Sequence, residues 1–272
     1  MIRALGRLAA TARGHGLGAP LRVVRDTLDR LFIAIGWTPL RVSVDGFVLG
    51  GFLRHRSFLA GLDDGYEPFL RELFDDAAAT ADLIMDVGSH TGLYALVASR
   101  TSPDLRVIAI EADPYNSAAL RRNVRGTGVE VVAKAVSDRV GRSTFRQNLG
   151  TIGSSLVERP GTGPLRMLEV ETTTIDTIAA DARSIVLKLD VEGAEIPALA
   201  GAVDTIRRAE RATLFVELNP RALAAAGSTG ADLVRVLREL ELDVWFIDES
   251  RRALIKPLDL QRKGNLLARK RA

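Results

Sequence analysis

The spacing of apolar positions changes along this chain, and each change marks a different kind of element. Over residues 1–35 apolar residues recur every three or four positions, which predicts an amphipathic helical segment with a break inside it. Residues 41–60 alternate apolar and polar around Asp45-Gly46, the pattern of a β-hairpin. A helical period then returns behind Pro68, a residue suited to the first turn of a helix, and it ends near Ala79.

From residue 82 onward, short apolar runs alternate with helix-period segments, apart from a Thr-, Ser-, Gly- and Arg-rich β-excursion at residues 140–175. This order indicates an α/β fold with a doubly wound, Rossmann-like and mostly parallel sheet, whose ligands bind at the carboxyl ends of the strands. The predicted strands are Leu83–Val87, Val107–Glu111, Val129–Ala133, Ile185–Leu189, Thr213–Leu218 and Val244–Asp248, with Ser143–Gln147 and Met167–Thr173 in the excursion. The predicted helices are Leu93–Ser99, Pro114 to about Arg125, Ala194–Ala200 and Ala231–Leu240.

Composition narrows the chemistry and the organisation of the chain. It has 272 residues and is 47% hydrophobic, enough for one large core. We divide it into an N-terminal extension with a hairpin (1–64), a ligand-binding α/β domain (65–250) and a basic C-terminal segment that can include the last strand (251–272). Cysteine is absent, which excludes disulfides, a thiolate nucleophile and Cys-ligated zinc. No membrane span or signal peptide is recognised, so we expect a cytoplasmic protein.

Charge is concentrated at the two ends of the chain. Residues 1–30 carry +4 and residues 250–272 carry +7, so the remainder carries −8 within a total of +3. We interpret the basic ends as solvated segments; peripheral contact with anionic lipid is the alternative. Aromatic residues make up only 5% and do not interleave with the basic ones, so we do not expect nucleic-acid binding. The amphipathic N-terminal segment suits either a cap on the domain or pairing in a homodimer.

Acidic or polar residues close one predicted strand after another. The first strand runs into Asp86-Val-Gly-Ser-His-Thr-Gly92, where two glycines four apart let a ligand approach the backbone. This spacing is neither that of a dinucleotide fingerprint nor that of a phosphate loop. Glu111 closes the next strand, where an acid suits two ribose hydroxyls. The later strands end in Ser137 and Asp138, in Asp190 and Glu192, and in Glu217 and Asn219.

Lys188 is unusual because lysine is rare in this chain and because of its position in the sequence. The chain has 37 Lys and Arg residues, of which only five are Lys, and Lys188 lies inside an apolar strand. Alternation places Lys188 and Asp190 on the same side of that strand, with Glu192 beyond its end. A buried lysine needs a carboxylate partner, and Asp190 can provide it. A purely structural ion pair is the alternative to a role in the site.

These motifs together resemble the FkbM family of S-adenosylmethionine-dependent methyltransferases over roughly residues 65–220. The loop and Glu111 are common to many class I methyltransferases, whereas Lys188-Leu-Asp-Val-Glu-Gly-Ala-Glu195 is much more specific to this family. The supporting stretches are Asp86–Gly92, Val107–Pro114 and Ala135–Asp138. His90 departs from the family pattern, in which Asn or a small residue is more common.

The resemblance implies a seven-stranded sheet with an antiparallel last strand and S-adenosylmethionine as the methyl donor. It implies that the donor is held by Asp86, Gly88, Ser89, Gly92 and Glu111, with adenine near Ala112, Ser137 and Asp138. Related proteins typically methylate hydroxyl oxygens of sugars, glycans or polyketide-type molecules. We therefore expect an O-methyltransferase whose acceptor is a small molecule or a glycan.

The chemistry of methyl transfer assigns roles to the remaining residues. Transfer from a sulfonium is an in-line displacement, so positioning and removal of the hydroxyl proton dominate catalysis. We predict that Asp190 or Glu192 orients or deprotonates the acceptor and that Lys188 depresses the carboxylate pKa, with His90 as the alternative base. No metal is predicted; the alternative is a hard cation held by oxygens of Asp190, Glu192, Glu217 and Asn219.

Three other functions fit parts of the sequence. A dehydrogenase would also use Glu111, but it needs the dinucleotide glycine spacing, which is absent. A nucleic-acid methyltransferase would use the basic ends, and Asn219-Pro220 resembles the start of an amino-group methyltransferase motif. A non-catalytic nucleoside-binding or scaffold module would keep the fold and not need the full set of strand-end acids.

Overall fold

The computed structural model describes most of the chain. Predictions that fall on residues 1–17, and on most of the loop at 150–163, lie outside the described residues. The described residues are 18–62, 65–102, 104–148, 154–157, 165–179, 181–257 and 259–271.

A mixed sheet forms the centre of the fold, and in the described residues it has eight strands in the order β12-β11-β13-β10-β9-β3-β4-β5. Its central strands are parallel, whereas β13 is antiparallel to both of its neighbours, β10 and β11. The sheet therefore contains the expected seven strands with an antiparallel last strand, and the short β12 adds an eighth at the edge. The strands are β3 Leu83–Val87, β4 Arg106–Ile110, β5 Glu130–Val132, β9 Ser184–Leu189, β10 Arg211–Leu218, β11 Leu242–Asp248, β12 Ala253–Ile255 and β13 Gly264–Lys270.

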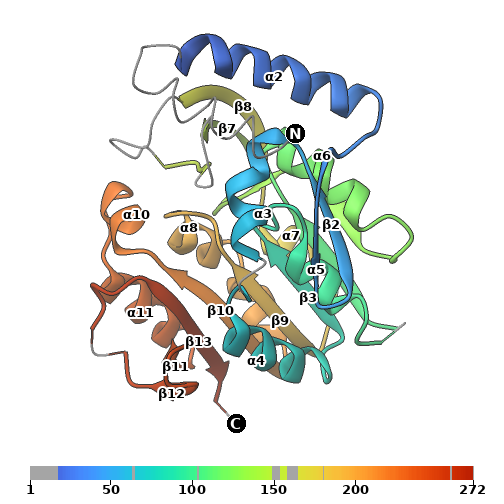
Figure 1. Ribbon diagram of the computed structural model, residues 1–272. Helices are drawn as coiled ribbons and strands as arrows, with labels where there is room; N and C mark the ends of the chain where they lie inside the picture. The colour runs from blue at the N-terminus through green and yellow to red at the C-terminus, as the bar shows by residue number, and fades with distance from the viewer. Residues whose placement is uncertain are drawn as a thin grey trace.

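Helices cover both faces of this sheet, as predicted for a doubly wound α/β fold (Figure 1). Alternate residues of each strand supply the two cores: Leu187 and Leu189 face one side of β9, while Val186 faces the other. One face packs against α3 Arg56–Leu62, α4 Pro68–Ala78, α5 Leu93–Ala98 and α6 Pro114–Asn123. The other packs against α7 Ile175–Ile178, α8 Glu195–Ala200, α9 Val203–Arg208, α10 Pro220–Ala225 and α11 Gly230–Glu239.

The predicted hairpin and excursion are both present. Strands β1 (Leu40–Val44) and β2 (Phe47–Gly51) pair across Asp45-Gly46, whose φ angles of 50° and 78° suit a two-residue turn. The alternation does not continue to residue 60, because a 3₁₀ turn and α3 follow at once and bury apolar residues at helical spacing. The excursion forms a separate three-stranded sheet of β6 Ala135–Val136, β7 Gly141–Asn148 and β8 Leu165–Thr173, and the 3₁₀ turn is η1 Leu53–His55.

Helix α2 (Gly18–Ala34) lies against η1 with its polar side inward. Asp29 is fully buried and accepts a hydrogen bond from the backbone N–H of Leu53 (2.8 Å), and the Arg54 guanidinium pairs with its second oxygen. Phe32 and Ile33 at the end of α2 pack against Phe52, Tyr115 and Ala119, whereas most apolar side chains earlier in the helix are exposed; these are Leu21, Val23, Val24, Leu28 and Leu31. None of the described helices is long and apolar enough to span a membrane.

Candidate active site

One open cavity lies at the carboxyl ends of β3, β4, β9 and β10. The empty space within it, including solvent at the mouth, is about 860 Å³. Glu111 from the end of β4 and Asp190 from the end of β9 both line it. The fold thus brings together acids that lie far apart in the sequence. Of the other predicted site residues, Gly88, His90, Ala112 and Glu192 also line the cavity.

Gly88 joins the two sides of this cavity. Its φ is +83°, and a Cβ built there would lie 1.9 Å from the backbone oxygen of Asp190. The N–H groups of Gly88 and Ser89 donate to the carbonyl of Ile110 at 2.9 and 3.0 Å, which anchors the loop to β4. Only glycine allows the turn after β3 to lie this close to the end of β9.

Two other predicted loop residues shape the turn without lining the cavity. The buried Ser89 hydroxyl donates to the backbone oxygen of Asp86 (2.5 Å). Gly92, with φ +94°, precedes α5, and a Cβ there would lie 2.6 Å from Leu120. Their contribution is to hold the backbone of the loop in place.

Glu111 is held by the backbone on both of its oxygens. Its Oε2 accepts from the N–H of His90 (2.8 Å) and its Oε1 from the N–H of Asp113 (2.7 Å). Burial, together with the charge of Asp113, raises the pKa of Glu111 to about 8. Each carboxylate oxygen has a second lone pair, so Glu111 can still accept hydrogen bonds from a ligand in the cavity.

Asp86 and the pair Ser137-Asp138 lie outside the cavity lining. Asp86 is only 2% exposed, lies beside Lys188 on the neighbouring strand, and has its pKa raised to about 6 by burial. Asp138 is exposed and accepts a hydrogen bond from the Ser137 hydroxyl (3.1 Å). At that side, Ala135 and Val136 line the cavity in their place.

Lys188 and Asp190 form the ion pair that strand alternation predicts. Lys188 is 3% exposed, its Nζ lies 3.1 Å from Oδ2 of Asp190, and it sits 4.6 Å from the ring centroid of Tyr94. Burial alone would raise the pKa of Asp190, but the attraction of Lys188 brings it below its ordinary value. Lys188 itself keeps its charge, because Asp190 and other nearby carboxylates raise its pKa more than burial lowers it.

The rest of the motif, Val191 to Glu195, makes a tight turn that presents Glu192 to the cavity. Glu192 has a left-handed φ of 54° and accepts from the side-chain amide of Asn219 (3.2 Å). Gly193 has φ +104°, and a Cβ there would lie 2.7 Å from the backbone oxygen of Ala222. Both oxygens of the fully buried Glu195 accept from the N–H of Gly193, and burial raises the pKa of Glu195 to about 7. Glu195 therefore closes the turn.

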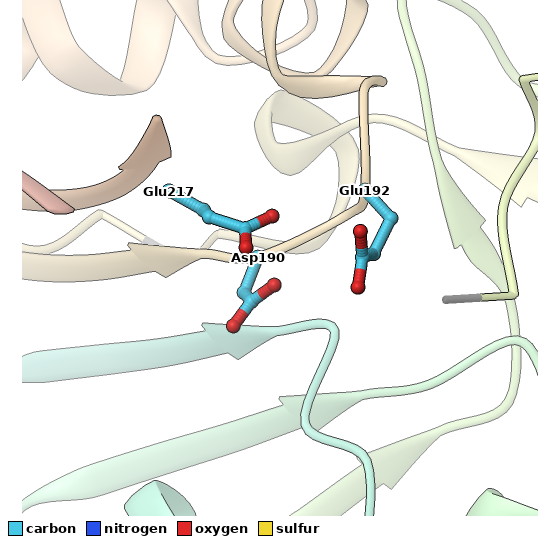
Figure 2. A group of neighbouring side chains, drawn as sticks. All are labelled: Asp190, Glu192 and Glu217. Carbon is cyan, nitrogen blue, oxygen red and sulfur yellow. The ribbon is translucent and has the colours of Figure 1, made fainter. Parts of the chain in front are cut away.

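Three carboxylates converge where β9 and β10 end. Oxygen atoms of Asp190, Glu192 and Glu217 lie within 4.8 Å of one another, and Figure 2 shows these side chains turned toward each other. Lys263 Nζ pairs with Oε1 of Glu217 at 2.8 Å. Burial and the neighbouring carboxylates raise the pKa of Glu217 well above its ordinary value. Asn219 turns its nitrogen toward Glu192, while its oxygen accepts from Ala222 N–H, so it does not add an oxygen to the group.

His90 packs among aromatic rings. Its ring centroid lies 4.2 Å from that of Phe58 and 5.3 Å from that of His55. Burial lowers the pKa of His90 to about 4, so its imidazole is neutral at pH 7 and a weak base. We considered His90 as an alternative base because the ordinary pKa of histidine lies near neutrality. The lowered pKa of His90 removes that argument.

Several lining residues were not singled out from the sequence. Phe58 and Tyr66, from α3 and the turn before α4, supply aromatic walls. Lys134 and Lys263 also line the cavity. The scarcity of lysine that drew attention to Lys188 applies equally to these two, and it is the signal that could have found them. Ser154, Ser155 and Leu156 reach the cavity from the excursion loop.

Glu67, directly before α4, connects three elements of the fold. Its oxygens accept from the Tyr94 hydroxyl (2.7 Å) and the Asn265 amide (2.9 Å), and it makes no side-chain cap. It therefore links α4, α5 and β13 behind the cavity.

The fold is that of the Rossmann-like class I methyltransferases, with an open cavity at the carboxyl edge of the sheet. The family model described as "Methyltransferase FkbM domain" matches residues 86–242, and the chain belongs to this family. It is a methyltransferase that uses S-adenosylmethionine. The cavity suits that donor, because Glu111 faces it beside a turn in which Gly88 admits no side chain.

Comparison with solved structures gives distant matches only. An O-methyltransferase from Bacillus cereus in complex with SAH is 12% identical, with 75% of this chain and 80% of that chain covered and a TM-score of 0.44. A SAM-dependent methyltransferase from Aquifex aeolicus is 14% identical (78% and 96% covered, TM-score 0.44). A putative RNA methyltransferase from Pyrococcus horikoshii is 10% identical (74% and 81% covered, TM-score 0.38). No curated protein sequence matches the chain.

Proposed function

We propose that this methyltransferase acts on a hydroxyl oxygen of a sugar, a glycan or a polyketide-type small molecule. The observation that carries the proposal is that Asp190 and Glu192 line the same cavity as Gly88 and Glu111. Bound S-adenosylmethionine supplies an electrophilic methyl group on a sulfonium, and the residues of the chain do the rest. Gly88 and Glu111 hold the donor at one end, which leaves the carboxylates at the other end for the acceptor.

The charged end of the cavity suits a neutral hydroxyl group. Asp190 is ionised at pH 7, because Lys188 keeps its pKa low, so its carboxylate accepts a hydrogen bond from the hydroxyl and orients the oxygen. The same low pKa makes Asp190 a better orienting group than a strong base. Glu192 stands beside it and is the second candidate to take the proton.

The walls and the charge of the cavity favour a small ring-bearing acceptor over a nucleic acid. Phe58 and Tyr66 present aromatic surface next to carboxylates, a combination that suits a ring carrying hydroxyl groups. Three carboxylates at the acceptor end would repel a phosphate backbone. This second point argues against the nucleic-acid alternative.

The test is a transfer assay with donor carrying a radiolabelled methyl group, run against small-molecule, glycan and nucleic-acid fractions of a crude extract. We expect label in a small-molecule or glycan product, and we expect that label to resist alkaline hydrolysis, as a methyl ether does and a methyl ester does not. Label in the nucleic-acid fraction would refute the proposed acceptor class, and label released as methanol by alkali would refute methylation of a hydroxyl. Heat-inactivated protein provides the background.

A further inference from the structure

Two lysines partly neutralise the three carboxylates of Asp190, Glu192 and Glu217. Lys188 engages Oδ2 of Asp190 at 3.1 Å, and Lys263 engages Oε1 of Glu217 at 2.8 Å. Each lysine holds one oxygen of its partner, so the second oxygen of each of these two carboxylates remains to bind something else.

Glu217 supplies an independent sign that a ligand belongs here. It is only 6% exposed, and its Oε2 is buried with no hydrogen-bond partner among the described residues. A buried carboxylate oxygen without a partner costs free energy, and such atoms are rare in native proteins. Glu217 lines the cavity, and Figure 2 shows its carboxylate group beside that of Asp190.

We propose that the carboxylates of Asp190, Glu192 and Glu217 form a binding site for one hard divalent cation. All three belong to the ligand class that Mg²⁺, Mn²⁺ and Ca²⁺ prefer. This assignment replaces the expectation from the sequence that no metal is bound, and it differs from the alternative there in that Asn219 is not a ligand.

The spacing of the oxygens agrees with a shared ion. Ligands of one Ca²⁺ ion lie at about 2.3–2.6 Å from it and so up to about 5.2 Å apart, whereas ligands of one Mg²⁺ lie up to about 4.2 Å apart. Oxygens of the three residues all lie within 4.8 Å of one another. The spacing is compatible with a shared Ca²⁺ ion after at most a small adjustment, and any pair more than about 4.2 Å apart must close or bind through water to share Mg²⁺ or Mn²⁺.

Neighbouring groups hold two of the ligands in place. The backbone N–H of Asp190 donates to Val87 of β3 at 3.0 Å, which fixes the start of the turn. The Asn219 amide orients Glu192, and Asn219 is itself held by capping α10. The ligands thus come from the ends of two neighbouring strands with limited freedom to move apart.

The role of the ion rests on the proposed O-methyl transfer, whereas its binding does not. A cation at this point would bind the acceptor oxygen and favour loss of its proton, because positive charge stabilises the alkoxide. Asp190 would then orient the acceptor through the ion as well as directly.

The experiment is isothermal titration of the chelator-stripped full chain with Ca²⁺, Mn²⁺ and Mg²⁺ separately, with and without S-adenosylhomocysteine. We expect one ion per chain, and at least a tenfold loss of affinity in Glu217→Gln and in Glu192→Gln. Glu239→Gln on α11, whose carboxylate pairs with Arg235, is the matched control and should bind like the wild type. Lys263 is 57% exposed, so Glu217→Gln leaves no buried unpaired cation, and a thermal unfolding curve checks its fold.

The possible outcomes distinguish failure of the cation site from failure of the proposed methyl transfer. No heat with any of the three ions, while S-adenosylhomocysteine binds, would overturn the cation site and leave the methyltransferase intact. Unchanged ion affinity in both Gln variants would also overturn it. Failure to bind S-adenosylhomocysteine would instead count against the proposed function. Methyl transfer that is lost on chelation and restored by the ion would support the role in catalysis, and transfer that survives full chelation would overturn that role.

Discussion

The two ends of the cavity differ in how their polar groups are paired. At the end formed by β3 and β4, Glu111 has both oxygens on backbone N–H groups, and the loop N–H groups of Gly88 and Ser89 bind a carbonyl. At the end formed by β9 and β10, carboxylates face one another and are held by two lysines. At the first end, backbone hydrogen bonds fix the loop and Glu111 in place. At the second, three acidic side chains lie within 4.8 Å of one another, and we therefore assign the chemistry and the choice of acceptor to that end.

Changing Gly88 should have the largest effect, because this residue joins the two ends. In Gly88→Ala the new Cβ would lie 1.9 Å from the Asp190 oxygen, so the loop must move. We expect loss of measurable S-adenosylhomocysteine binding and a fall in the free energy of unfolding of more than about 3 kcal/mol. Calorimetry and urea unfolding measure the two effects.

Gly126 provides the matched control for this change. Its φ is +81°, close to that of Gly88, but no atom lies within 4 Å of its Cβ position. Gly126→Ala should therefore show only the backbone strain, about 1 kcal/mol, with normal ligand binding. Equal effects of the two substitutions would mean that the contact with Asp190 is unimportant.

Asp190→Asn should lower kcat without weakening donor binding, and so distinguish the roles of the two ends of the cavity. The amide keeps the shape of the side chain but cannot take a proton or carry charge, so kcat should fall by about 10²–10⁴-fold. S-adenosylhomocysteine affinity should change little, because Glu111 and the loop hold the donor. The control is Asp243→Asn on β11, which removes a carboxylate paired with Arg271 at the surface. A loss of donor affinity as large as the loss of kcat would contradict the division.

Glu111→Gln should show the opposite pattern. At pH 7 Glu111 mostly keeps its proton, so the change affects hydrogen bonds of a neutral carboxyl group, which contribute about 0.5–1.5 kcal/mol each. We therefore expect S-adenosylhomocysteine to bind about 2–10-fold more weakly. kcat at saturating donor should change much less. A large fall in kcat with unchanged donor affinity would move Glu111 out of the donor end.

Because the pKa of Glu111 is raised, the free energy of unfolding of the wild type and of Glu111→Gln should depend differently on pH. Because its pKa in the folded protein is about 8, Glu111 keeps its proton to higher pH than in the unfolded chain. Its contribution to the free energy of unfolding is therefore full below about pH 4.5 and is lost as pH rises toward 8, by up to about 1.4 kcal/mol per pH unit. Urea unfolding should show this decline in the wild type and a weaker one in Glu111→Gln. A wild-type curve that rises over this interval would contradict the burial of a protonated Glu111.

His90→Asn should have the smallest effect. With a pKa of about 4 and a place between Phe58 and His55, His90 acts by packing. We expect kcat to fall less than about tenfold, against about 10²–10⁴-fold for a general base. If kcat falls further than that, and if an acid limb near pH 6.5 in the wild-type pH profile of kcat is absent from the profile of His90→Asn, His90 would instead be the base.

The elements that the sequence predicted well are those with local signals. β3 and β9 are apolar runs between polar residues, and alternation alone put Lys188 beside Asp190. Helices α9 and α10 were missed, because we assigned one helix to each interval between strands, and α9 and α10 share their intervals with α8 and α11.

The parts of the site that could not be predicted depend on packing between distant elements. Asp86 and Glu111 both look like strand-end acids, yet only Glu111 faces the cavity. Asp86 lies one residue before the end of β3 and turns to the face that α4 and α5 cover. Lys263 lies far from Glu217 in the sequence and reaches it only because β13 pairs with β10.

The position of β13 has a consequence for how the protein matures. Residues 264–270 are inserted between β10 and β11, both of which are synthesised earlier. Until that stretch leaves the ribosome, the two strands have a gap between them and exposed hydrogen-bonding edges, and Lys263 is not beside Glu217. The pairing of Lys263 with Glu217 can therefore form only after residues 264–270 have been synthesised and have entered the sheet.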